Sequence, residues 1–438
     1  MTIRLPLLGV YIIKVDQRIL SSLREKIQAW RRGLLVATGV PDTGDDGGPA
    51  AGRVLTLLHR RGPLTRAAVT AELGLAASAV GTALGDLTAL DLVRIGEPPR
   101  GSPGAPPGRG RPSPVVEVNP DGPVAVAVQL SVDRITVGLV GLDRRISRVR
   151  KHVLDGSEAD PATLIPALAD AVSKAALWTE RRCVGVCVAT PGFVREPDGF
   201  VRSALHLGWN EVPLAQQLGG MAPIGVPVAV GRAATLAALA EFRYGAGRGV
   251  ASMLALSSER VGVGGGFIDA GIPLTGGGHA LEAGHIIVEP GGLPCPCGAR
   301  GCLEMYADSR ALLRAAGPRR HPGREDPVTE IFDDAAAGDR AAQEAIHLTA
   351  SHLVTGLTSL VNTLAPERVV LMGFLADLYR AAKDFVRDGL MASSTVARAG
   401  QIDIVTGDLR HATLIGAAEK AFAPLLRQPR TILRTAPS

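Results

Sequence analysis

The chain has few aromatic residues and no long apolar run. Only 3% of its 438 residues are Phe, Trp or Tyr, although 46% are hydrophobic. Small aliphatic residues must therefore build the core, which favours an α/β protein with close helix–sheet contacts over an aromatic-rich β-sandwich. No apolar segment reaches the roughly 18 residues of a membrane-spanning helix, and Lys14 and Asp16, not a small-residue cleavage site, follow the apolar stretch 5–13. We expect a cytoplasmic protein with no membrane partner.

The chain also has only a small excess of basic residues and few cysteines. A net charge of +5 on 438 residues is a weak field unless the basic residues cluster. The five cysteines do not form an even set for disulfides, and Cys183 and Cys187 lie four apart in an apolar segment, where a strand places both in the core. This usage is typical of a reducing compartment. The length predicts two or three domains.

The other three cysteines gather with a histidine within a span of eighteen residues. Zn²⁺ prefers four tetrahedral nitrogen and sulfur ligands, and a closed Cys3His set indicates a structural ion that holds a loop. Prolines and glycines between the cysteines supply the short turns that let the thiols converge. The alternative, a chance cluster of buried thiols, does not explain this arrangement. The predicted zinc ligands are His285, Cys295, Cys297 and Cys302.

Four segments follow one another along the chain. Residues 1–51 form an extension that is disordered or accessory, and residues 428–438 form a C-terminal tail. Between 52 and 118, apolar residues at helical spacing are interrupted at Gly62-Pro63 and at Gly74, and a third helix over 76–90 precedes a strand. Three short helices followed by a hairpin predict a winged helix-turn-helix. Residues 119–427 form the remaining domain.

The predicted winged helix indicates operator DNA as a partner. Ser78 and Thr82 on its third helix, with Arg94, are expected to meet the major groove and the backbone, and Arg109 and Arg111 of the wing the minor groove. The alternative for the wing is a Pro/Gly linker. The third helix also carries Ala and Gly where base-reading side chains are common, so that binding rests on the wing and DNA shape, or the domain has become a protein-interaction module.

Strand-like and helix-like segments alternate beyond residue 124. Two similar halves, each opening on a strand hairpin, predict a duplicated, bilobed α/β architecture with a central cleft. Strands are expected at 124–130, 135–143, 183–189, 227–230, 251–257, 262–269 and 369–372, and helices at 162–178, 214–218, 233–243, 308–316, 338–364 and 415–426.

This arrangement resembles the ROK family of repressors, uncharacterised reading frames and sugar kinases. The motifs that carry the resemblance are Gly262 to Gly266, the run Glu282-Ala283-Gly284-His285, and the cysteine spacing followed by Glu304. The resemblance covers residues 52 to about 427. It implies an actin-like, ribonuclease H-like sugar-kinase fold, zinc on the Cys3His set, and a sugar bound by Glu282, His285 and Glu304. Carboxylates suit vicinal hydroxyls, and a histidine held by zinc offers its other nitrogen to a sugar oxygen.

The residues that phosphoryl transfer requires are missing at three places. The resemblance implies an Asn-Asp pair at the start of the central helix, but the chain has Arg232 and Ala233; Gln129 stands where a metal-facing aspartate is usual. Met372 and Phe374 are expected to fill the adenosine space. The glycine run is weak evidence for a phosphate site, since glycine also serves close-packed strands. We therefore assign no catalytic residue and expect a protein that is not an enzyme.

The expected sugar site is also altered. His206 stands where an asparagine is usual in the family, and Arg232 replaces another sugar-binding residue. A guanidinium in the cleft favours an acidic or phosphorylated sugar, whereas the alternative is an Arg232 that points to solvent.

We therefore expect a transcriptional repressor that senses a sugar or a sugar phosphate. Two-fold operator symmetry implies a homodimer or a dimer of dimers, and the effector shifts it between DNA-competent and incompetent geometries. The alternatives are an ATP-dependent ROK sugar kinase and an interaction module without DNA binding.

Overall fold

The computed structural model describes residues 49–96, 114–154, 159–196, 198–221, 225–259, 261–318, 326–400 and 402–435. Its contacts divide the chain into the units Met1–Asp45 and Asp46–Ser438. The extension 1–48 and most of the wing, with Arg109 and Arg111, lie outside the described residues.

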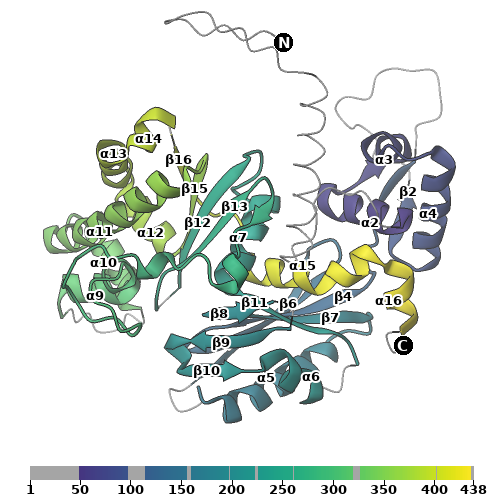
Figure 1. The fold of residues 1–438 in the computed structure, drawn as a ribbon, viewed down its shortest axis with the longest axis horizontal. Coiled ribbons are helices and arrows are strands. Elements are labelled where there is room, and N and C mark those ends of the chain that lie inside the picture. The colour runs from purple at the N-terminus through teal and green to yellow at the C-terminus, as the bar shows by residue number, and fades with distance from the viewer. Residues whose placement is uncertain are drawn as a thin grey trace, which may run out of the picture. The chain divides into compact units, whose positions relative to one another are not determined.

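Residues 50–118 form the expected winged helix-turn-helix (Figure 1). The Thr65 hydroxyl accepts the backbone N–H of Ala68 at 3.2 Å and so caps the second helix. Gly74, with φ of 59°, ends that helix in a left-handed conformation. The helices are α2 (Ala50–Arg61), α3 (Arg66–Leu73) and α4 (Ala77–Ala89), and the sheet order is β1 (Leu64–Thr65), β3 (Val115–Val118), β2 (Val93–Gly96).

The first lobe of the following domain is a five-stranded sheet. Its first three strands in chain order form an antiparallel meander, and two parallel strands follow on the other side of the first. The order across the sheet is β11 (Val228–Arg232), β7 (Cys183–Thr190), β4 (Val124–Leu130), β5 (Arg134–Gly141), β6 (Ile146–Val153).

The second lobe repeats this plan. Two antiparallel pairings and two parallel pairings again place the strand that comes first in the chain at the centre. The sheet order is β14 (Ile272–Pro273), β13 (Gly264–Asp269), β12 (Ser252–Ser258), β15 (Arg368–Gly373), β16 (Asp403–Thr406). The duplicated α/β fold predicted from the sequence is therefore confirmed.

Helices cover both sheets. In the first lobe α5 (Pro161–Ala176) and α6 (Leu214–Met221) pack on one face, beside a small sheet of order β10 (Trp209–Val212), β9 (Phe200–Ala204), β8 (Phe193–Arg195). The central helix α7 (Ala233–Tyr244) packs on β13 and on α15 (Ala412–Arg427). The second lobe carries α8 (Glu304–Ala307), α9 (Ser309–Ala316), α10 (Pro327–Ala336), α11 (Arg340–Leu364), α12 (Phe374–Ala381), α13 (Lys383–Ser393) and α14 (Thr395–Gly400).

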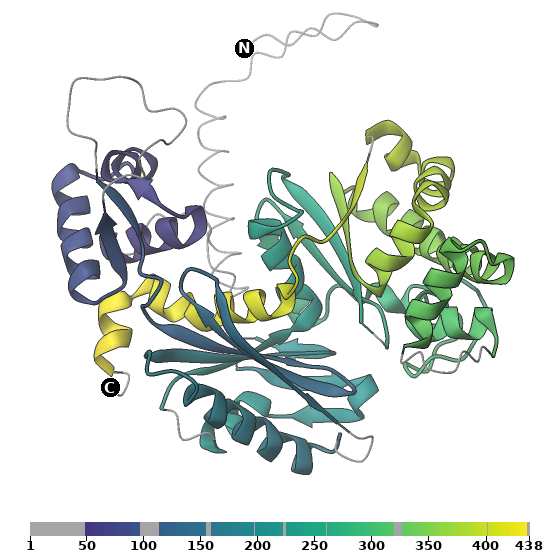
Figure 2. The same ribbon diagram turned by 180° about the vertical axis from the view of Figure 1, so that it is seen from behind.

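The winged helix shares one hydrophobic core with the first lobe. Leu55 and Leu58 of α2, Val116 of β3, and Phe422 and Leu425 of α15 belong to the same buried cluster. Figures 1 and 2 both show α15, in yellow, lying along the first sheet and reaching α2. Residues 429–435, which the sequence assigned to a tail, form helix α16 (Pro429–Thr435), and Leu433 is buried in this cluster. The two folds are therefore packed together rather than joined by a linker alone.

A buried charged network lies at this junction. His59, which is 0% exposed, has Nε2 at 2.5 Å from a carboxylate oxygen of Glu419 and Nδ1 at 2.6 Å from the carbonyl oxygen of Leu142. Because both partners are acceptors, both ring nitrogens carry protons and the imidazole is a cation. Arg243 of α7 donates to the second Glu419 oxygen at 2.8 Å. One carboxylate thus joins α2, α15 and α7.

The surroundings of Glu419 favour its ionised form. Burial raises the pKa of this carboxyl, but the charges and hydrogen bonds of His59 and Arg243 outweigh burial and lower it from 4.5 to about 2. The native state therefore binds fewer protons here than the unfolded chain between these two values, so its stability falls as the pH drops through that range.

No single described helix is long and apolar enough to cross a membrane. One bent pair, α3 with α4, passes the same test of length and composition, with an angle of 117° between the helices. Val69, Val80 and Leu84 of this pair are buried in the core of the winged helix, which accounts for their apolar character.

The Glu419→Gln variant is expected to be less stable by about 3 kcal/mol at pH 7, because it leaves the buried His59 and the partly buried Arg243 without their counter-charge. Its stability should also lose the part of the acid dependence between pH 4.5 and 2 that Glu419 causes. Urea unfolding followed by circular dichroism at pH 7 and pH 3 measures both effects. Glu344→Gln removes an exposed carboxylate of α11 paired with Arg340 and should cost less than about 0.5 kcal/mol. Equal midpoints for the two variants would contradict the assignment.

Candidate functional site

The four predicted zinc ligands converge in the structure. The Cys295 Sγ lies 3.6 Å from His285 Nδ1, and the Sγ atoms of Cys297 and Cys302 lie 3.6 Å apart. All four ligand atoms lie within 4.8 Å of one another. Zn–S bonds of about 2.3 Å imply a tetrahedron edge of about 3.8 Å, so the donor set fits the ion. These residues form a structural zinc site.

Short turns hold this loop in place. Isolated bridges pair Ile287 with Cys302 and Pro294 with Arg300, and they bring the two ends of the cysteine loop together. Gly301 has φ of 84°, and a Cβ there would lie 1.8 Å from the carbonyl oxygen of Glu289. Only glycine fits at this position.

The zinc loop contributes directly to a cavity between the two lobes. His285 directs Nδ1 toward the thiols, and its Nε2 lies 3.7 Å from Glu282. Glu304, which is 2% exposed, accepts a hydrogen bond from His206 Nε2 at 3.1 Å, and its other oxygen lies 3.1 Å from the Cys295 Sγ. The cavity measures about 440 Å³ and is lined by Glu282, His285, Glu304, Arg232 and His206 among others. The structure therefore gathers all five predicted sugar-binding residues.

Arg232 is the buried cation of this cavity. It occupies the N-cap position of α7 without a side-chain capping bond, is 9% exposed, and donates through Nη2 to Glu282 and to the carbonyl oxygen of Leu281. Its Nη1 is buried and has no hydrogen-bond partner among the described residues. Burial lowers the pKa of the guanidinium, and Glu282 opposes this. The interpretation that Arg232 points to solvent is wrong.

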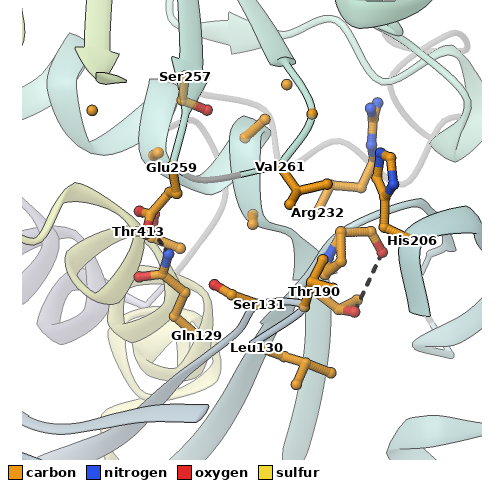
Figure 3. A pocket seen from close by; sticks show the side chains of 18 of the residues that line it. Gln129, Leu130, Ser131, Thr190, His206, Arg232, Ser257, Glu259, Val261 and Thr413 are labelled. Atoms are coloured by element: carbon orange, nitrogen blue, oxygen red, sulfur yellow. Dashed lines mark hydrogen bonds between the residues drawn. The ribbon is translucent and has the colours of Figure 1, made fainter. Parts of the chain in front are cut away.

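A hydrogen bond between the lobes closes the opposite end of the cavity. Gln129, at the end of β4, donates Nε2 to Glu259, which follows β12, at 2.9 Å. Figure 3 shows these two side chains with Thr413 on one side of the pocket, and Arg232 with His206 on the other. The sequence analysis missed Glu259, because no motif indicates a carboxylate that meets a residue 130 positions away. Its charge would repel a nucleotide phosphate placed against Gln129 at this end of the cavity.

The prediction that Phe374 fills the adenosine space is wrong. Met372 lines the cavity, but Phe374 is buried in the core of the second lobe, where its ring lies 6.1 Å from that of Phe332. Phe374 begins α12, which turns its side chain away from the cavity and into that core.

The glycine run serves close packing. Cβ atoms at Gly264 and Gly266 would lie 2.9 Å and 2.6 Å from the methyl groups of Ala234 and Ala238 on α7. A Cβ at Gly265 would lie 2.7 Å from the methyl group of Ala283 on the opposite face. The run therefore lets α7 approach β13, which agrees with the alternative role for these glycines.

The DNA-binding candidates within the described residues lie on the surface. Ser78 and Thr82 are exposed on α4, and Arg94 is exposed on β2 and pairs with Asp121 at 2.7 Å. The sequence analysis missed Arg66, whose guanidinium donates to the carbonyl oxygen of Ala77 at 3.3 Å, at the first turn of α4. Arg66 thus adds a positive charge beside the expected recognition helix.

The purified protein is expected to carry one Zn²⁺ per chain by elemental analysis. Cys297→Ser should lower the zinc content after dialysis against a chelator, and should lower the midpoint of thermal unfolding, because a structural ion contributes its binding energy to folding. Cys183→Ser, outside the cluster, is the matched control and should keep its zinc. Zinc-free wild-type protein with an unchanged midpoint would refute the assignment.

Two curated proteins illustrate what the chain is similar to. A glucokinase from Halalkalibacterium halodurans is 32% identical over 264 residues, which is 56% of this chain and 79% of that protein. A putative xylose repressor from Caldicellulosiruptor sp. is 30% identical over 288 residues, which is 62% of this chain and 71% of that protein. The similarity thus extends to both kinases and repressors.

Solved structures agree with the fold. A ROK family transcriptional regulator, a homolog of the E. coli MLC protein, superposes with a TM-score of 0.70 over 88% of this chain and 96% of that chain; its 22% identity shows the fold alone. A ROK family glucokinase from Streptomyces griseus, in complex with glucose and AMPPNP, gives a TM-score of 0.60 at 26% identity, over 68% and 99%. The sequence model of the ROK family matches residues 125–420, which is more than half of the chain. The chain therefore belongs to the ROK family.

Proposed function

We propose that this protein is a sugar-responsive transcriptional regulator, a repressor, in which a winged helix binds operator DNA and a non-catalytic ROK domain binds the effector. The observation that carries this proposal is the buried network of His59, Glu419 and Arg243. It ties the winged helix to α15 and α7, and the first turns of both helices line the effector cavity.

Helix α7 is the physical link between the two sites. It begins at the cavity, where Arg232 pairs with Glu282, and ends at Arg243, which pairs with Glu419. Its twelve residues span about 18 Å. A ligand that displaces Arg232 or Glu282 therefore acts on an element packed against α15 and α2. If the effector binds more tightly when α7 is in one of two positions, it shifts the protein between DNA-competent and incompetent states.

The kinase alternative is supported by similarity to glucokinases and opposed by the residues of this cavity. Arg232 and Ala233 stand at the start of α7, where the family resemblance implies a base, and neither accepts a proton at neutral pH. Gln129 offers an uncharged amide where a metal-facing carboxylate is needed, and Glu259 adds a negative charge between the lobes. Loss of a general base alone typically costs about 10²- to 10⁴-fold in rate.

Operator binding is expected to depend on the two arginines of the wing. In mobility-shift assays with DNA from the protein's own upstream region, Arg109→Ala with Arg111→Ala should weaken binding and lower the slope of log affinity against log salt by about 2, because two phosphate-region contacts are lost. The matched control removes two exposed arginines of the second lobe, Arg340→Ala and Arg387→Ala, and should bind like the wild type. Absence of a salt-dependent shift in the wild type would instead support an interaction module.

Phosphoryl transfer is expected to be absent. Zinc-loaded protein with glucose, Mg²⁺ and ATP should form no sugar phosphate, while a ROK glucokinase serves as the positive control in the same assay. Phosphosugar formed at a rate that Glu282→Ala abolishes would overturn the regulator proposal in favour of the enzyme.

A further inference from the structure

We infer that the effector is an anionic sugar, one that carries a phosphate or carboxylate group, and that Arg232 selects it. The inference rests on the proposed function, because it names the ligand class of the same cavity. It is carried by two observations: the bonding of the Arg232 guanidinium, and the partners that the other charged side chains of the cavity have or lack.

The guanidinium of Arg232 is fixed in place and still has an unused donor. Nη2 is held by the Glu282 carboxylate and the Leu281 carbonyl oxygen, which sets the orientation of the planar group. Nη1 is buried, faces no acceptor among the described residues, and belongs to a side chain that lines the cavity. A buried N–H without an acceptor costs free energy that a ligand oxygen recovers. The neighbouring Ala233 also lines the cavity, and its methyl group presents no negative charge to that oxygen.

The carboxylates that line the cavity already have partners. Asp133 pairs with Arg134 at 2.9 Å, Glu259 accepts from Gln129, Glu282 binds Arg232, and Glu304 binds His206. The charges of Asp133 and Glu282 are thus neutralised by arginines, and Glu259 and Glu304 already accept hydrogen bonds from neighbouring side chains. Each carboxylate oxygen can accept more than one hydrogen bond, so Glu282 and Glu304 can still accept sugar hydroxyls.

Two cations of the same cavity lack such partners. Lys151 of β6 and Arg410, just before α15, line the cavity, and neither forms an ion pair or a side-chain hydrogen bond that the described part of the chain supplies. Helix α15 begins beside them without a side-chain cap, so its N-terminal N–H groups add positive potential. A ligand entering the cavity thus meets, at the start of α15, two cations without a counter-charge and the free N–H groups of a helix N-terminus.

An anionic group satisfies these features better than a neutral hydroxyl does. Phosphate or carboxylate oxygens accept a charge-assisted hydrogen bond from Nη1, whereas a hydroxyl supplies an acceptor without charge. Lys151 and Arg410, which line the same cavity, attract the anion through their field rather than by contact. The sugar ring then lies toward Glu282, Glu304 and His206, and the anionic substituent toward Arg232. Phosphate and carboxylate share this chemistry, and the experiment below distinguishes them.

Calorimetry on full-length, zinc-loaded protein tests the inference. The probes are glucose, glucose 6-phosphate and glucuronate, together with N-acetylmannosamine and its 6-phosphate. At least one anionic sugar should bind about tenfold or more tightly than its neutral parent. This preference should shrink as NaCl rises from about 0.05 to about 0.3 M, because the exposed Lys151 and Arg410 are screened. Glucose 6-phosphate against glucuronate shows which anion is preferred.

Two double variants show which side chains cause the preference for an anionic sugar. Arg232→Gln combined with Glu282→Gln keeps the buried pair uncharged and should bring the ratio of anionic to neutral affinity close to one, with the thermal unfolding midpoint reporting that the fold is kept. Lys151→Ala with Arg410→Ala alters only exposed side chains and should lower the ratio about three- to tenfold at low salt. Arg398→Ala, which bonds to carbonyl oxygens within the second lobe, should leave the ratio unchanged.

The outcomes separate this inference from the proposed function. A neutral sugar that binds as tightly as its anionic form, or a panel in which no probe binds, overturns the anionic effector. Wild-type ratios in the Arg232→Gln, Glu282→Gln protein overturn the role of Arg232. If an anionic sugar is preferred but no DNA is bound in the mobility-shift assay, the regulator proposal fails and the effector class stands. If DNA is bound and a neutral sugar releases it, the regulator stands and the anionic effector fails.

Discussion

The Glu419 carboxylate is the constraint on which the arrangement of this protein depends. It is buried, and it is tolerable there only because His59 and Arg243 both donate to it. Each of the three residues comes from a different helix, so the position of any one helix fixes the other two. Apolar packing around α15 supplies most of the area of the junction, whereas the ion pairs specify its geometry.

The cleft has two ends of different chemistry. At one end, the zinc loop, Glu282 and Glu304 present hydrogen-bond acceptors that their neighbours hold in place. At the other end, an amide and a carboxylate meet across the lobes, and two cations stand beside the start of α15. Between them, the start of α7 carries Arg232 and Ala233 rather than a carboxylate.

Local patterns in the sequence predicted local structure well. The three helices of the winged helix, the paired strand hairpins and the Cys3His cluster all follow from residues close together in the chain, where periodicity and turn chemistry act directly. Strand β6 was not foreseen, because its burial pattern is that of an edge strand with mostly exposed charges. The contacts of His59 with Glu419 and of Gln129 with Glu259 join residues 360 and 130 positions apart, and no single-sequence pattern encodes such pairings. The side-chain direction of Arg232 was left open for the same reason.

His285 belongs to two sites at once, since one ring nitrogen faces the thiols and the other lies 3.7 Å from Glu282 in the cavity. A zinc ion on the thiol side would therefore set the orientation of a residue that lines the cavity. Removal of the ion would release the cysteine loop and this imidazole ring together, so that the shape of the cavity would depend on the supply of metal.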